Sequence, residues 1–151
     1  MFNLVYRDGA PENTGHYEVF ETDGTTDLAV GTLVSISGGK AIAYSSGVPY
    51  GMVAIGTDDA NTKDDAAFDS VAVLRIDNDM IFRTICGSSS ADPVLHLNHK
   101  KGNIVSFVKD TIGAELVTSG YGFEITDVTV ISYSFGIPSS GIVEGRFVKV
   151  D

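Results

Sequence analysis

The sequence predicts an all-β fold with at most one short helix. Short runs rich in valine and isoleucine recur along the 151 residues, and turn residues, among them many of the 17 glycines, separate them. The apolar content of 43% is too high for a disordered chain, and no long run of strong helix formers occurs. A chain of this length can bury a sizeable core within one domain.

The stretch 31–56 carries the clearest strand pattern. Apolar and polar residues alternate over 30–36, and further apolar runs follow at 40–44 and 50–55. Gly38 and Gly39 separate the first two runs and can adopt the positive φ of a two-residue hairpin turn. We therefore expect three short strands joined by tight turns.

Residues 1–27 are interpreted as an N-terminal arm, and residues 28–151 as the β-domain. Apolar residues alternate at the start of the arm, and a turn-rich segment at 9–15 separates them from a short strand expected at 16–20. Because termini order only when something holds them, we expect residues 1–15 to bind a neighbouring subunit or a larger partner instead of the chain's own core. The candidate contact residues are Phe2, Leu4, Val5 and Tyr6.

The middle of the chain predicts a hairpin and the single helix. A β-branched run at 70–76 and a strand at 80–86 flank the turn residues 77–79, as expected for a hairpin over 70–86. Asp92 and Pro93 can begin a short helix over 93–100, because proline suits the first helical turn.

From residue 103 the pattern again indicates strands. They are expected at 103–108, 114–117, 123–135 and 142–150. Within 123–135 the apolar positions change from odd to even numbers, and this change of phase predicts a β-bulge near Asp127.

A shift of 71 residues aligns two parts of the chain without a gap. Gly31 aligns with Gly102, and Tyr50-Gly51 aligns with Tyr121-Gly122. One interpretation is a duplicated β-unit, in which Gly51 and Gly122 occupy equivalent positions at strand starts. The alternative is that similar hairpins simply need glycines at similar places.

The charge balance and the cysteine content restrict the possible partners. The formal net charge is −10, from 20 acidic and 10 basic residues, so nucleic acid and anionic membranes are not expected partners. No apolar run approaches the roughly 20 residues of a membrane helix. With one cysteine and no signal-peptide pattern, synthesis in the cytoplasm is expected.

No motif for catalysis, a metal or a cofactor is complete. The aspartate-rich loop departs from the EF-hand pattern, because Lys63 stands at an oxygen-ligand position and Asp64 at the required glycine. His96 and His99 could share a helix face but supply only half of a zinc site. Cys86 has no base tied to it by sequence and is expected to be a small buried side chain. We therefore expect no enzyme activity, no metal and no cofactor.

Four motifs in residues 28–76 resemble a known family. They are Gly-x-Leu-Val at 31–34, Ser-Gly-Gly-Lys-Ala at 37–41, Ser-Gly-Val-Pro-Tyr-Gly-Met-Val-Ala at 46–54 and Val-x-Val at 71–73. This stretch resembles the small capsid decoration, or cement, proteins of tailed bacteriophages, and the rest of the chain matches them loosely. The resemblance implies a β-barrel or β-tulip-like fold, often trimeric, that reinforces the outer face of the capsid lattice.

The expected function is accordingly that of a structural virion protein on the capsid exterior. Its partner would be the major capsid protein, and apolar residues on both faces of several strands favour a homo-oligomer, such as a trimer. One alternative is another virion β-protein, such as a head-fibre base or a tail adaptor. A second is a carbohydrate-binding module, which the lack of tryptophan disfavours. Its stacking candidates would be Tyr44, Tyr50, Tyr121 and Tyr133.

Overall fold

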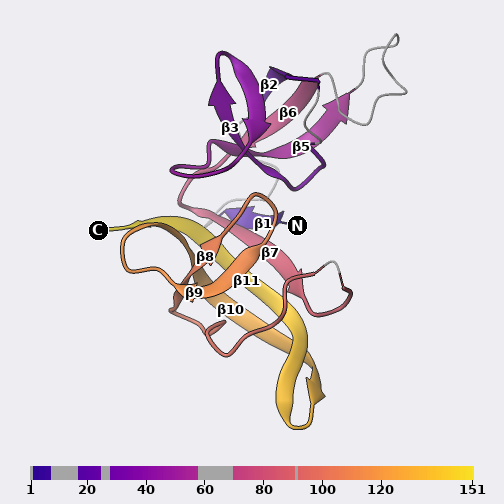
Figure 1. Cartoon of the computed structure of the whole chain (residues 1–151), viewed down its shortest axis with the longest axis vertical. Coiled ribbons are helices and arrows are strands. Elements are labelled where there is room, and N and C mark those ends of the chain that lie inside the picture. Colours follow the sequence, from indigo (N-terminus) through magenta and orange to yellow (C-terminus); the bar gives the residue numbers. More distant parts are fainter. Residues whose placement is uncertain (1, 8–16, 25–27, 58–69, 91) are drawn as a thin grey trace.

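A computed structural model describes residues 2–7, 17–24, 28–57, 70–90 and 92–151. Within these ranges the chain forms eleven strands and no helix, which confirms the all-β prediction. Five strands form a closed barrel and the other six form a second sheet (Figure 1).

The barrel has the strand order β2-β4-β3-β5-β6. Its strands are β2 Tyr17–Thr22, β3 Leu33–Ser37, β4 Lys40–Ala43, β5 Gly51–Thr57 and β6 Ser70–Arg75. Neighbours are antiparallel except β2 and β4, which run parallel. Gly38 and Gly39 both have positive φ, 57° and 78°, as the predicted two-residue turn requires. Small side chains such as Val34, Val53 and Val73 fill the interior.

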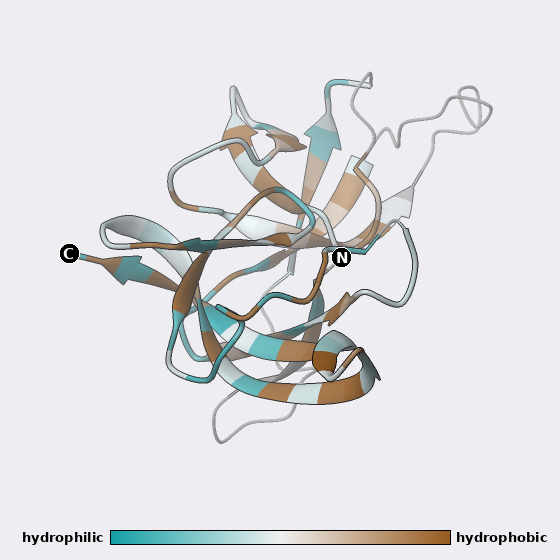
Figure 2. Ribbon diagram, turned by 60° about the horizontal axis from the view of Figure 1, so that its bottom comes forward, coloured by the Kyte–Doolittle hydropathy of each residue, from teal (hydrophilic) through white to brown (hydrophobic). Residues whose placement is uncertain are grey.

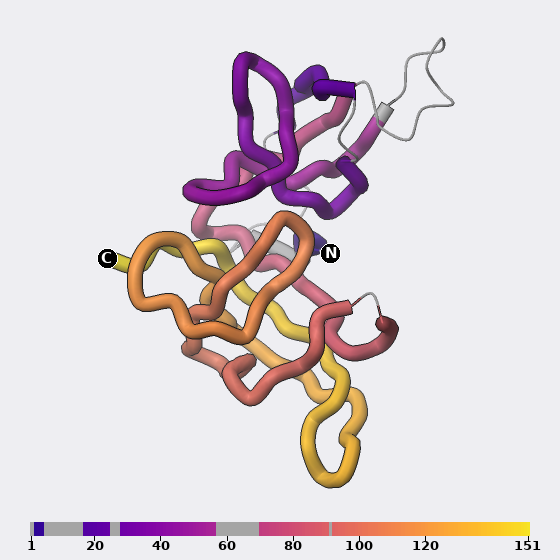
Figure 3. Tube along the Cα trace, in the orientation of Figure 1, coloured from indigo at the N-terminus to yellow at the C-terminus, as the bar shows by residue number. Residues whose placement is uncertain are grey.

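The second sheet has the order β1-β7-β11-β10-β8-β9, and every neighbouring pair is antiparallel. Its strands are β1 Asn3–Arg7, β7 Met80–Cys86, β8 Ile104–Phe107, β9 Ile112–Leu116, β10 Gly120–Ser134 and β11 Ile137–Val150. The long strands β10 and β11 form a hairpin whose far end projects beyond the rest of the sheet (Figures 1 and 3). The β10–β11 register shifts between Ile125 and Asp127, which confirms the predicted bulge.

A shared aromatic core joins the barrel to the sheet. The centroid of the Phe147 ring lies 5.0 to 5.2 Å from the ring centroids of four other phenylalanines, all in edge-to-face geometry. They are Phe2, Phe82, Phe107 and Phe123. From the barrel side, Tyr44 stacks on Phe107 at 5.3 Å. Leu33, Met52 and Leu74 of the barrel strands belong to the same buried cluster, so barrel and sheet pack as one body.

Phe2 belongs to this core, which corrects, for the start of the chain, the expectation that residues 1–15 bind a neighbour instead of the chain's own core; residues 8–15 lie outside the described part of the structure. The Phe2 side chain is 0% exposed, and Leu4 packs partly buried against the same cluster. Their strand β1 pairs with β7, a partner about 80 residues away that leaves no local sequence signature. Part of the predicted arm also forms the barrel strand β2. The side chains of Val5 and Tyr6 lie outside the described part of the structure.

The predicted hairpin over 70–86 is wrong. Its two strands form as β6 and β7, but β6 belongs to the barrel and β7 to the sheet. Residues 77–79 therefore carry the chain from one sheet to the other, through a turn in which the Met80 amide donates to the Asp77 carbonyl. A local turn signal cannot distinguish a hairpin from such a crossing.

The predicted helix over 93–100 is also wrong. The His96 amide donates to Nδ1 of His99, and the Asn98 amide donates to Nδ1 of His96, both at 3.0 Å. The Nδ1 atoms of these imidazoles accept hydrogen bonds from nearby backbone amides and so compete with the hydrogen bonds of a helix. The segment is consequently irregular.

The two sheets repeat one strand order, as a duplicated unit requires. The barrel order β4-β3-β5-β6-β2 corresponds to β9-β8-β10-β11-β7 in the sheet. The barrel is closed because β2 pairs with β4. The second sheet stays open, because β7 pairs with β1 instead of with β9.

Two pairs of glycines also correspond. Gly31 and Gly102 have φ of 90° and 91°. The Gly31 amide donates a hydrogen bond to the Val53 carbonyl, and the Val53 amide donates one to the Thr32 carbonyl. In the same way, the Gly102 amide donates to the Ile125 carbonyl, and the Ile125 amide donates to the Asn103 carbonyl. Gly51 begins β5 and Gly122 is the third residue of β10; a Cβ would collide with Val73 at the first and with Ile104 at the second.

Candidate functional site

The described residues offer little material for catalysis. Within them, no group of three or more His, Cys, Asp or Glu is placed to hold a metal ion, and no helix is long and apolar enough to cross a membrane. Cys86 is fully buried at the end of β7, as expected. Burial, and then the nearby Asp92 carboxylate, raise the pKa of its thiol to about 11, so the nucleophilic thiolate does not form near neutral pH.

The two neighbouring histidines are occupied by structural hydrogen bonds. Their Nδ1 atoms accept the backbone hydrogen bonds described above, and Nε2 of His99 lies 2.8 Å from the Gly113 carbonyl. Since that carbonyl accepts, His99 carries its proton on Nε2 and is neutral. Burial lowers the pKa of His99 and reinforces this neutral state. The arrangement fixes the irregular segment instead of presenting ligands.

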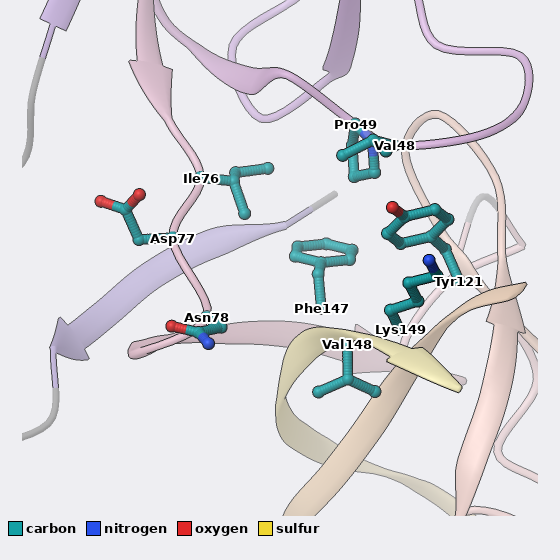
Figure 4. A pocket seen from close by; sticks show the side chains of 9 residues that line it. All are labelled: Val48, Pro49, Ile76, Asp77, Asn78, Tyr121, Phe147, Val148 and Lys149. Atoms are coloured by element: carbon teal, nitrogen blue, oxygen red, sulfur yellow. The ribbon is translucent and has the colours of Figure 1, made fainter. Parts of the chain in front are cut away.

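A cavity of about 440 Å³ lies where the barrel meets the sheet (Figure 4). Phe147 stands at its centre between Ile76 on one side and Tyr121 on the other, while Asp77 points away from Tyr121 (Figure 4). The complete lining is Val48, Pro49, Ile76, Asp77, Asn78, Tyr121, Phe147, Val148 and Lys149. Because no nucleophile–base pair converges there, the cavity has no evident catalytic arrangement.

The far end of the β10–β11 hairpin is apolar and exposed. We call four of its residues the hairpin surface: Ile131, Tyr133, Phe135 and Ile137, which are 61%, 64%, 101% and 60% exposed. No charged residue occurs among the sixteen positions from Val128 to Val143, although 20% of the chain is charged. Hydrophobic bands continue along the hairpin to its far end (Figure 2). Exposed strands ordinarily carry charges that prevent association, so this hairpin has the composition of a contact surface.

The turn of the hairpin holds its phenylalanine in an unusual backbone conformation. Phe135 and Gly136 have φ of 52° and 78°, which is the pattern of a type I′ turn. Asn, Asp and Gly are the residues preferred at such positions, and a bulky residue with positive φ is an outlier. The turn therefore holds the fully exposed Phe135 ring on a backbone conformation that carries local strain.

An apolar groove lies beside the part of the same hairpin that leads to its turn. It has a volume of about 360 Å³, and we call it the hairpin groove. One wall comes from the irregular segment and the other from the hairpin, with the lining Leu95, His96, Leu97, His99, Lys100, Val128, Val130, Ile137 and Pro138. Leu97 is 67% exposed at this groove.

The barrel carries a second exposed apolar surface. Val19 on β2 and Ile55 on β5 both pair with Ala72 on β6, so the three side chains lie side by side across the strands. Val19 is 75% exposed and Ile55 is 58% exposed, whereas the alternate residues Val71 and Val73 fill the barrel. We call Val19, Ala72 and Ile55 the barrel stripe.

The residues singled out in the sequence fall in different settings. Phe2 is core and Leu4 is partly buried, so neither forms an exposed contact site on this chain. The four tyrosines proposed for carbohydrate stacking form no single platform. Tyr44 is 9% exposed, and Tyr50 packs on Phe20 and donates a hydrogen bond from its hydroxyl to Glu18 at 2.8 Å. Tyr121 lines the cavity between the barrel and the sheet, and Tyr133 belongs to the hairpin surface.

Neither the hairpin surface nor the barrel stripe was predicted from the sequence. The available signal was the absence of charge from residue 128 to residue 143, together with Phe-Gly at a turn. Comparison with protein families, with curated proteins and with solved structures found no match for this chain.

Proposed function

We propose that this chain is a structural virion protein of a tailed bacteriophage, a decoration protein that binds the outer surface of the capsid lattice and stabilises it. The observation that carries the proposal is a pair of exposed apolar surfaces on an acidic β-protein, the barrel stripe and the hairpin surface. The barrel and the far end of the hairpin lie at opposite ends of the molecule (Figure 1). A protein that covers a lattice needs two kinds of contact, one with the lattice and one with other copies of itself.

The barrel stripe is assigned to the capsid. The motifs shared with decoration proteins span residues 28–76, which include the barrel strands β3 to β6 and two of the three stripe residues, Ile55 and Ala72. Contact with the major capsid protein would cover these side chains, and binding that requires the assembled lattice stabilises that lattice by mass action. The protein then lies on the capsid exterior, where its charge of −10 faces solvent.

A co-sedimentation assay tests the assignment. Capsids assembled from the major capsid protein encoded beside this chain are mixed with purified protein, and the pelleted protein is quantified. Saturable binding and a higher capsid melting temperature are expected. Ile55→Lys should abolish binding, because it places a charge in the stripe. The matched control is Val108→Lys, since Val108 is 54% exposed on a loop outside both surfaces and its variant should bind normally.

Two results would contradict the proposal. One is that the wild-type protein does not pellet with capsids at any ratio. The other is that it binds isolated tails or fibres instead, which would favour the head-fibre base or tail adaptor. If Ile55→Lys and Val108→Lys bind capsids equally well, the barrel stripe is not part of the capsid contact.

A further inference from the structure

We infer that the hairpin groove receives the Phe135 side chain of a second copy of this chain, so that copies join head to tail. The inference rests on the proposed function, because it names the partner of the hairpin surface of that decoration protein. Phe135 projects at the tip of the β10–β11 hairpin, and the groove lies along the same hairpin close to that tip, with Ile137 and Pro138 in its lining. Each copy thus carries both halves of the contact.

The groove and the ring agree in size and polarity. A dry apolar cavity of about 150 Å³ is sufficient to bind benzene, and the groove offers about 360 Å³. Aliphatic side chains from both walls, including Leu97, Val130 and Pro138, line it. Phe135 has no contact to lose on insertion, because it is fully exposed in the free chain.

Charge favours a second copy as the occupant. Two chains of net charge −10 repel each other unless they meet where acidic groups are absent. The hairpin from residue 128 to residue 143 and the opposite wall from residue 93 to residue 98 contain no charged residue. The charged group that lines the groove is Lys100, which is cationic. Copies can therefore approach at this end without bringing acidic groups together.

The strained turn is an independent indication. A positive φ at a fully exposed phenylalanine costs free energy that nothing within the described part of the chain repays. Insertion into a neighbour's groove would compensate that cost. Aromatic residues that anchor in a well-packed pocket of the partner are a recurrent form of interface hot spot.

A head-to-tail contact of this kind can close into a ring. Each copy gives Phe135 to one neighbour and receives the Phe135 of another, so the contact is heterologous, and heterologous contacts of suitable rotation close into rings. In a ring every copy donates one Phe135 and receives another. Such a ring agrees with the trimer expected from the sequence, and its closure adds avidity that a single junction lacks.

The experiment uses two complementary variants of the full chain. Phe135→Asn removes the ring but suits the type I′ turn, so its groove and fold remain. Leu97→Arg places a cation at the groove, at a side chain that is already 67% exposed, so its Phe135 remains available. Circular dichroism checks that both variants are folded, and Val108→Ala on the β8–β9 loop is the matched control.

Sedimentation velocity without capsids provides the first measurement. We expect the wild-type protein and Val108→Ala to form a small closed oligomer. Each complementary variant alone should be monomeric, with self-association weakened at least about thirtyfold, as for loss of a hot-spot residue. A monomeric wild type, or an oligomer that neither variant disturbs, would overturn the inference.

Mixing the two variants provides the decisive measurement. ¹⁵N-labelled Phe135→Asn protein is titrated with unlabelled Leu97→Arg protein, and amide shifts are followed by NMR. We expect shifts confined to the segment 95–100 and to the hairpin residues that line the groove, and a heterodimer with one junction. No shift on mixing would overturn the Phe135-in-groove contact and favour symmetric packing of hairpins.

The capsid assay separates this inference from the proposed function. A monomer that still binds capsids would overturn the inference and leave the function standing. A ring that binds no capsid would support the inference and contradict the function. If the wild type is monomeric and Phe135→Asn loses capsid binding, the groove partner is a capsid subunit and the inference is wrong.

Discussion

Replacing Phe2 by alanine should destabilise the protein strongly, because the second residue of the chain is part of its core. The Phe2 ring is 0% exposed and lies 5.5 Å from the ring of Phe123 and 5.1 Å from that of Phe147. Truncation removes the transfer free energy of the ring, leaves a cavity and deletes both ring contacts. Changes of this kind cost about 3–5 kcal/mol in well-packed cores.

The expected loss is large enough to measure by thermal unfolding. For a chain of this size, each kcal/mol shifts Tm by about 2–4 °C, so Phe2→Ala should lower Tm by roughly 6–20 °C. Urea unfolding followed by circular dichroism gives the free energy directly. Asn3→Ala is the matched control, since Asn3 is exposed on the same strand and its truncation should change stability by less than about 0.5 kcal/mol.

A melt of Phe2→Ala within about 1 °C of wild type would refute the reasoning. That result would mean that β1 does not hold its place in the free protein. It would also revive the interpretation of the first residues as an arm that is ordered by a partner.

Three further predictions concern the hairpin turn, His99 and Cys86. Phe135→Asn should raise the free energy of unfolding by about 1 kcal/mol, because asparagine tolerates positive φ; urea unfolding below the association concentration measures this, and a loss of stability would contradict the type I′ assignment. Burial lowers the pKa of His99, so the unfolded chain binds a proton at a higher pH than the folded one. Stability should therefore fall as pH drops below about 6.5, until the lower folded pKa is reached, and His99→Gln should reduce that dependence between pH 7.5 and 5.5. The Cys86 thiol, with a pKa of about 11, should react with a disulfide reagent only after unfolding, and rapid native labelling would contradict its burial.

Local features of the fold were predictable from the sequence. The turn at Gly38-Gly39, the bulge between Ile125 and Asp127, and most strand segments follow from alternation and turn chemistry, which act within a few residues. Pairing over long distances was not predictable. Nothing near Phe2 indicates that β1 joins β7, and nothing near residues 77–79 indicates that the chain changes sheets there.

The contact surfaces were harder to predict than the strands. Whether an apolar strand residue faces a core or solvent depends on which strands cover it, as Val19 and Phe2 illustrate with 75% and 0% exposure. Histidine side chains also replaced the helix expected over 93–100, because they hydrogen-bond to the backbone that would have formed it. The resulting irregular segment forms one wall of the hairpin groove.

Cryo-electron microscopy of the phage particle that encodes this chain tests the proposed function most directly. The map should show copies of the barrel and the six-stranded sheet on the outer face of the capsid, with Val19 and Ile55 toward the major capsid protein and the hairpin toward a neighbouring copy. Absence of the protein from the particle, or its location at the tail or inside the shell, would contradict its role as a decoration protein.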